Sequence, residues 1–261
     1  MLTLLFLETA SLPIATISLW AKTSGTWINV ATILFGTLLG LLLRKSLPSA
    51  MQQVITQGVG LVTLFLGVTM ASSLLKAQAG RVDGIILALL AIVFGGLLGE
   101  GLQLEERLYT LGEWLKARFK GEGSFTEGFV AASLLFCIGP MAIIGSLNNG
   151  VAGDNTVLTI KATMDGLAAI ALTSSYGIGV GFSSLMILLY QGGLSLLAGL
   201  LPQILANPTT NPHVLITSGV GGLIILGIGL NLLDIAKVKV ASFLPALLLA
   251  PLLYSLAKWV T

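Results

Sequence analysis

The sequence predicts an all-α, polytopic membrane protein with about eight spans, each needing about 20 apolar residues. Of its 261 residues, 55% are hydrophobic and only 9% are charged, whereas a soluble domain carries about a quarter charged residues. Glycine is also frequent, with 32 residues. A chain of this composition needs lipid as its main solvent. That excludes a soluble enzyme, a disordered chain and a nucleic-acid-binding protein.

Apolar segments of sufficient length follow one another along most of the chain. The longest neutral stretch, 166–233, has 68 residues without Asp, Glu, Lys or Arg. Glycine and proline clusters interrupt it at 177–181, at Pro202 and at 207–212, as expected between helices. The predicted spans are 25–43, 50–75, 83–101, 126–147, 157–177, 181–201, 214–233 and 240–259.

Residues 1–20 are apolar as well, but they contain Glu8 and Pro13. They could form a ninth span or a signal-like leader, although no basic residues precede the apolar run as they do in a secretory leader. We expect an additional membrane-associated segment at the N-terminus.

Residues 102–125 form the most charged part of the chain, since ten charged residues fall between positions 100 and 127. Apolar residues recur there at intervals of three and four, which is the spacing of one helical face. We predict an interfacial amphipathic helix with Trp114 at the level of the lipid headgroups. A cytoplasmic hairpin and a partner-binding helix are the alternatives. The apolar stripe consists of Leu104, Leu108, Leu111, Leu115 and Phe119.

Lysine and arginine in the short loops predict the orientation, because cytoplasmic loops carry an excess of both. The loops after the first, third and seventh predicted spans lie on one side and hold eight of the 13 basic residues. We therefore place loops 44–50 and 102–125 in the cytoplasm and the C-terminus outside.

Residues 55–60 (ITQGVG) and 216–221 (ITSGVG) match at five of six positions. If they correspond, units 25–101 and 181–259 are three-helix repeats of opposite orientation, a common arrangement in transporters. The alternative is coincidence in a chain rich in glycine and leucine. The expected organisation is an N-terminal extension (1–24), a first unit (25–101), the amphipathic segment (102–125), a central two-helix region (126–180) and a second unit (181–259).

Polar side chains at membrane depth mark the candidate site, because they need partners or a wet cavity. Asp165 is the strongest candidate, since it follows Lys161 by four residues and lies about two helical turns inside its span. It could bind a proton or a cation, or the two residues could form a structural pair. Ser133 and Cys137 precede Pro140, which frees backbone carbonyls for a ligand or merely kinks the helix.

Two amides also fall inside predicted spans, Asn29 in the first and Gln191 in the sixth. Each could bind a polar ligand or another helix. The chain has one histidine, His213, and one cysteine, so we expect no metal site and no cofactor. It also lacks metalloprotease and P-loop motifs, so we expect no enzymatic activity.

Residues 125–146 (FTEGFVAASLLFCIGPMAIIGS) resemble the central signature of the YdfK/YqgA-like bacterial inner-membrane proteins. The resemblance extends over about 25–258 and also includes residues 25–29, 161–166, 177–180 and 190–192. It implies a location in the bacterial inner membrane. It names no substrate, because the family is one of unknown function. It also groups Ser133, Cys137, Pro140, Asp165 and Gln191 as one motif set.

We therefore expect a transporter or channel for a small solute or ion, with its site among the fourth to sixth spans. Asp165 would titrate or bind a cation, and Ser133 and Gln191 would be neutral ligands. The alternative is a membrane scaffold or regulator that acts through the 102–123 helix. The expected partners are the lipid bilayer and the solute or ion, with no nucleic acid. The sequence is compatible with homo-oligomers.

Overall fold

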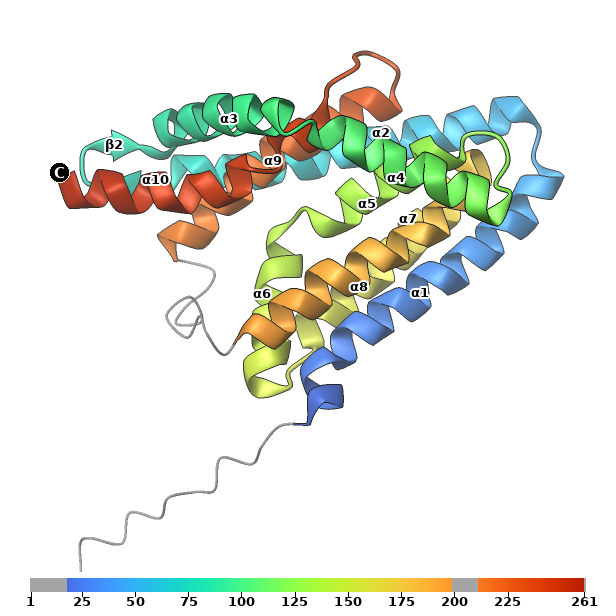
Figure 1. Cartoon of the computed structure of the whole chain (residues 1–261), viewed down its shortest axis with the longest axis horizontal. Helices are drawn as coiled ribbons and strands as arrows, with labels where there is room; N and C mark the ends of the chain where they lie inside the picture. Colours follow the sequence, from blue (N-terminus) through green and yellow to red (C-terminus); the bar gives the residue numbers. More distant parts are fainter. Residues whose placement is uncertain (1–17, 199–210, 261) are drawn as a thin grey trace, which may run out of the picture.

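A computed structural model describes residues 18–198 and 211–260. The predicted N-terminal segment up to residue 17 and the break from Pro202 to residue 210 lie outside the described residues. Within them the chain is almost entirely helical (Figure 1). In the described ranges, seven helical segments are long and apolar enough to cross a membrane, and a bent pair of helices would be an eighth span. The predicted all-α polytopic class is confirmed.

The helices follow the predicted spans closely. A short hairpin of β1 (Gln78–Ala79) and β2 (Val82–Asp83) precedes the third span. The 3₁₀ helices η1 (Ser72–Leu75) and η4 (Val240–Phe243) continue the second span and begin the last. The α-helices that complete the straight spans are α1 (Leu19–Ser46), α2 (Ser49–Ala71), α3 (Gly84–Gly101), α7 (Thr156–Tyr176), α8 (Gly179–Leu197), α9 (Pro212–Leu232) and α10 (Ala246–Val260).

The fourth predicted span is broken rather than merely kinked. α5 (Phe125–Cys137) and α6 (Pro140–Ala152) are bent by 63° relative to each other. Pro140 occupies the first turn of α6, where its missing N–H costs no hydrogen bond. The backbone of Gly139 has a φ of 157°, a value that residues other than glycine rarely adopt. The Gly-Pro pair therefore ends one helix and starts the next.

Glycine contacts fix the relative directions of the spans. Gly25 packs against Leu158 near the starts of α1 and α7, and Gly40 packs against Thr173 near their ends, so these helices are parallel. In contrast, Thr37 of α1 packs against Gly181 at the start of α8, so α8 runs the opposite way. Successive spans thus alternate in direction.

Three connections gather at one end of the molecule, which we call the basic end. They are the turn 47–48 after α1, the segment that contains α4 (Leu104–Phe119), and residues 233–239 after α9 (Figure 1). The Arg44 side chain packs against Gly177 there. Lys239 forms an ion pair with Glu100. The hairpin and the α6–α7 turn lie at the opposite end.

The helix α4 lies over α5 and η4 at the basic end and is held by polar contacts at its start and in its second half. Thr126 of α5 donates a hydrogen bond of 2.5 Å to Glu113. The backbone N–H of Ala241 donates one of 2.7 Å to Glu105. Burial raises the pKa of the Glu105 carboxyl, and the bond from Ala241 opposes that rise.

The apolar stripe of α4 is divided between protein and surroundings. Leu115 is buried and Leu108 packs partly against the core. Leu111 and Trp114 are exposed. Part of the stripe predicted to contact the membrane therefore forms the contact between α4 and the protein.

The close packing of α1 and α7 depends on small residues at their crossing. A Cβ at Gly36 would overlap the Gly166 carbonyl oxygen, and one at Gly40 would lie 2.6 Å from the Ile170 carbonyl oxygen. Neither backbone can yield without moving a whole helix. The two helices therefore touch backbone to backbone.

We predict that Gly36→Ala lowers the free energy of unfolding by about 1–3 kcal/mol, because overpacking forces the helices apart. Thermal unfolding in detergent measures this effect. Gly193→Ala is the matched control, since nothing lies within 4 Å of its Cβ position. Alanine is favoured over glycine in a helix by about 1 kcal/mol. Equal melting temperatures for the two variants would contradict the packing argument.

Candidate functional site

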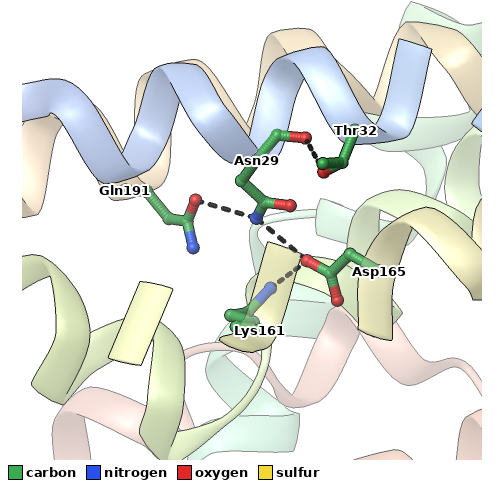
Figure 2. Close-up of polar contacts among 5 residues, drawn as sticks. All are labelled: Asn29, Thr32, Lys161, Asp165 and Gln191. Carbon is green, nitrogen blue, oxygen red and sulfur yellow. Dashed lines mark hydrogen bonds and ion pairs between the residues drawn. The ribbon is translucent and has the colours of Figure 1, made fainter. Parts of the chain in front are cut away.

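Four polar side chains from three spans form one network in the middle of the helix bundle (Figure 2). The amide of Asn29 donates hydrogen bonds to Asp165 Oδ2 at 2.9 Å and to Gln191 Oε1 at 3.0 Å. Lys161 forms an ion pair with Asp165 on the same face of α7. Asn29 and Gln191 are completely buried, and Lys161 and Asp165 are 6% and 8% exposed. We call these four residues the polar cluster.

The polar cluster lies near half-depth of the spans that carry it. At 1.5 Å per residue, Asp165 is about 14 Å from the first residue of α7, and Asn29 is about 15 Å from the first residue of α1. Gly192 follows Gln191 directly, and a Cβ at Gly192 would lie 3.8 Å from the Thr26 Cγ2 atom of α1. Close helix contacts thus bring α1, α7 and α8 together where the polar residues lie.

The hydrogen-bonding capacity of the polar cluster is only partly used. Both N–H groups of the Asn29 amide are engaged, but Asn29 Oδ1 and Gln191 Nε2 have no partner among the described residues. A buried polar atom without a partner costs about 1–3 kcal/mol. Such atoms in a folded protein call for an explanation, and a ligand or water that completes the network is one.

A cavity of about 620 Å³ borders the polar cluster. It lies between α2, the α5–α6 break, α7 and a single residue of α9, Ile225. Lys161 and Asp165 form its charged wall, while most of the lining is apolar. The other lining residues include Val59, Val62, Leu66, Met70, Phe136, Pro140, Met141, Met164, Leu167 and Ala168.

A second, smaller hollow of about 270 Å³ lies at the basic end and is lined mainly by polar residues. It follows the cavity along the same seam between α2 and α7. The cavity reaches Gly58 and Ala171, and the hollow begins at Gln57 and Ser175. Cavity and hollow are therefore arranged in series from the polar cluster toward the basic end.

At the opposite end of the bundle, Asn149 ties α6 to the start of α1. Its Oδ1 accepts a hydrogen bond of 2.9 Å from the Gly25 backbone, and its Nδ2 donates to the Ala21 carbonyl at 2.8 Å and to Ser24 Oγ at 3.1 Å. Leu158, which is fully buried, packs against Gly25 beside it. We call the bonds from Asn149 to α1 the clasp.

The structure connects three of the sequence-predicted site residues directly, namely Asn29, Asp165 and Gln191. Pro140 lines the cavity at the helix break. Ser133 is buried, and its hydroxyl has no partner in the described ranges. Ser133 and Cys137 form no hydrogen bond to the polar cluster within the described part of the chain.

Sequence reasoning assigned two parts of the site incompletely. Lys161 was expected only as a structural partner of Asp165, yet it also faces the cavity. The wall formed by α2 was not expected at all, because residues 58–70 carry no charge that would mark a site. Asn149 could have been noticed as an amide in an apolar segment. Among the described residues, no three His, Cys, Asp or Glu side chains gather as metal ligands do.

Comparison with known proteins places the chain in a family. Residues 24–255 match the family model described as "Protein of unknown function (DUF554)". The chain belongs to this family. It is 30% identical over 227 residues to "Uncharacterized membrane protein YdfK" of Bacillus subtilis (strain 168). The aligned residues are 87% of this chain and 93% of the relative.

A similar relationship holds with a second relative. "Uncharacterized protein YqgA" of Escherichia coli (strain K12) is 32% identical over 243 residues, which is 90% of this chain and 98% of the relative. No solved structure matches the chain. The expected resemblance to YdfK/YqgA-like proteins is confirmed.

We predict that Asp165→Leu lowers the free energy of unfolding by about 3–5 kcal/mol, because it leaves the buried Lys161 ammonium without a counter-charge. The double variant Lys161→Met/Asp165→Leu should recover most of this loss, since no unpaired charge is left behind. Thermal unfolding of the purified protein in detergent gives both values. A double variant that is less stable than Asp165→Leu would show that the ion pair is not the cause.

Proposed function

We propose that the protein is a transporter for a small solute or ion, with the polar cluster as its binding site. The observation that carries the proposal is the buried Lys161–Asp165 pair, which faces a cavity near half-depth of the spans. Ionisable residues at this depth are costly and mark substrate or ion pathways in membrane proteins. The proposal assigns no chemical reaction to the protein.

The ion pair supplies a means of coupling. In the described conformation, Asp165 Oδ2 receives both the Lys161 ammonium and the Asn29 amide. A proton or a cation that binds Asp165 weakens its attraction for the ammonium. Lys161 then becomes available to a second ligand in the cavity. Binding of the coupling ion and binding of the solute are thereby linked at one carboxylate.

A transporter must expose its site to the two sides of the membrane in turn. The cavity and the polar hollow lead toward the basic end, and the clasp closes the other end. This arrangement favours a carrier over a channel, since a channel requires a continuous water path. Gly139 and Pro140, at the break between α5 and α6, provide a place where the packing can change.

The packing of the helices supports inverted repeats in units 25–101 and 181–259. Each helix of the first unit contacts its expected counterpart in the second, as α1 does with α8, α2 with α9 and α3 with α10. Helices α2 and α9 run antiparallel, because Gly60 packs against Leu233 and Gly229 packs against Leu64. An in-plane pseudo-two-fold axis between the units produces contacts of this kind. Gly150 of α6 packs against Ser195 of α8, so rocking of the second unit, with α6 attached, against the first would open and close the clasp.

The orientation is part of the proposal. The basic end holds eight of the 13 lysine and arginine residues, so we place it in the cytoplasm of a bacterial cell and the protein in the inner membrane. The polar hollow then faces the cytoplasm in the described conformation.

A second candidate function is that of a membrane scaffold acting through α4. The exposed side chains of Leu111 and Trp114 favour it. Leu111→Ser/Trp114→Ser tests it without disturbing the buried Leu115. Loss of a bound partner with unchanged solute flux in liposomes would support the scaffold.

We predict that a monovalent cation or small solute that binds the polar cluster raises the melting temperature of the wild-type protein. A stabilisation screen of purified protein against such compounds measures the shift. The same compound should have no effect on Asp165→Asn, and its flux into liposomes should be lost in that variant. The control is Asp154→Asn, since Asp154 lies exposed in the α6–α7 turn. Equal shifts in both variants would remove Asp165 from the binding site.

We also predict that access to the site differs between the two sides of the membrane. In a Cys137→Ala background, Gln57→Cys in the polar hollow should react with a membrane-impermeant thiol reagent only from the basic end. Thr26 is buried in α1 between the clasp and the polar cluster, so Thr26→Cys should react from neither side. Adding Asn149→Ala should make Thr26→Cys reactive from the opposite end. Labelling of intact and inverted vesicles measures the reactivity of each cysteine from each side. Reactivity of Gln57→Cys from the opposite end alone would contradict the proposed access.

A further inference from the structure

The cavity that borders the polar cluster also opens onto the outer surface of the bundle, between α2 and α7. Two of its lining residues, Val62 and Leu167, are 60% and 64% exposed. Both lie near the middle of their helices, where the outer surface of a membrane protein contacts lipid chains rather than water. Met141 of α6 and Met164 of α7 also line the cavity and are exposed. A molecule dissolved in the bilayer can therefore reach the cavity without passing through either aqueous side.

The interior of the cavity has an apolar body and one polar end. Its lining is mainly apolar and includes three leucines and three methionines. Thr63 and Thr69 are neutral, whereas Lys161 and Asp165 supply charge at a single place. Both described bonds to Asp165 reach Oδ2, which leaves Oδ1 for a ligand. The Lys161 ammonium carries three donors, and one of them is directed at Asp165.

The charges at that polar end already compensate each other. A solute with a single ionic head that bound without the coupling ion would pair with one of them and leave the other buried without a partner, at a cost of several kcal/mol. A neutral hydroxyl avoids this cost, since it can accept a hydrogen bond from Lys161 and donate one to Asp165. The polar end thus favours a neutral head group that both donates and accepts.

We infer that the cavity binds a single-chain amphiphile with a neutral hydroxyl head, which enters from the bilayer between α2 and α7. A volume of about 620 Å³ is of the size that binds a small organic molecule. The inference names the substrate class of the proposed transporter and in that respect rests on the proposed function. The binding itself does not require transport. A helix of a second copy would not satisfy the donors of Lys161 with its apolar side chains.

The test uses the full chain in phosphatidylcholine nanodiscs and a dodecanol that carries a photoreactive diazirine in its chain. We expect saturable labelling of α2 and α7 near Val62, Met164 and Leu167, and competition by unlabelled dodecanol. Leu167→Trp should fill the opening and abolish the labelling. The matched control is Leu189→Trp, at a site on α8 that is 70% exposed and does not line the cavity, and it should label as the wild type does.

The head group is tested separately. Lys161→Met/Asp165→Leu, which leaves no unpaired charge, should weaken dodecanol binding about tenfold, as expected for the loss of one hydrogen bond to a charged group. The same diazirine on dodecane, without the hydroxyl, should bind about as weakly to the wild type. Equal labelling by the two probes in the wild type would overturn the assignment of the head group.

Other occupants give different results. Equal labelling of the cavity by a photoreactive phosphatidylcholine, or a disulfide between two copies of Val62→Cys, would overturn the inference, as would full labelling of Leu167→Trp. Saturable dodecanol binding without any flux across liposomes would contradict the transport function but keep the binding site. Flux of a polar solute through a protein that does not bind dodecanol would contradict the amphiphile site but keep the transport function.

Discussion

The ion pair between Lys161 and Asp165 is the constraint around which the rest of the bundle is arranged. Two charges near half-depth of a membrane are stable only when each has a partner and when further hydrogen bonds satisfy the carboxylate. Asn29 supplies such a bond from α1, and Gln191 of α8 in turn orients Asn29. Glycines at the α1–α7 crossing let the helices approach closely enough for this network to form. Packing and electrostatics therefore determine the same geometry.

The break between α5 and α6 gives this network access to its surroundings. A continuous fourth helix would present a regular surface to α2 and α7, whereas a 63° bend at Gly139 and Pro140 leaves room beside them. The space lies next to the charged pair and continues toward the polar hollow at the basic end. On the other side, Asn149 ties α6 to α1. The same broken span thus borders the cavity on one side and ties α6 to α1 on the other, and the proposed transport function depends on both features.

The sequence predicted those features that the bilayer itself dictates. Spans follow from the length of apolar segments, because the thickness of the hydrocarbon core fixes the number of residues needed. Asn29, Asp165 and Gln191 were recognisable because polar groups at that depth need partners. Their mutual contacts were not, since they depend on how α1, α7 and α8 cross. The α2 wall left no signal, because leucine and valine look alike whether they face lipid or a cavity. The stripe of α4 was ambiguous for the same reason.

Isotope-edited infrared difference spectroscopy of the aspartate carboxyl tests the central claim most directly, namely that Asp165 contacts the ligand. The protein carries labelled aspartate, and spectra are compared before and after addition of a compound that stabilises the fold. We predict a change in a carboxyl band that is absent from Asp165→Asn and present in Asp154→Asn. Binding of the compound with no change in the band assigned to Asp165 would contradict the account.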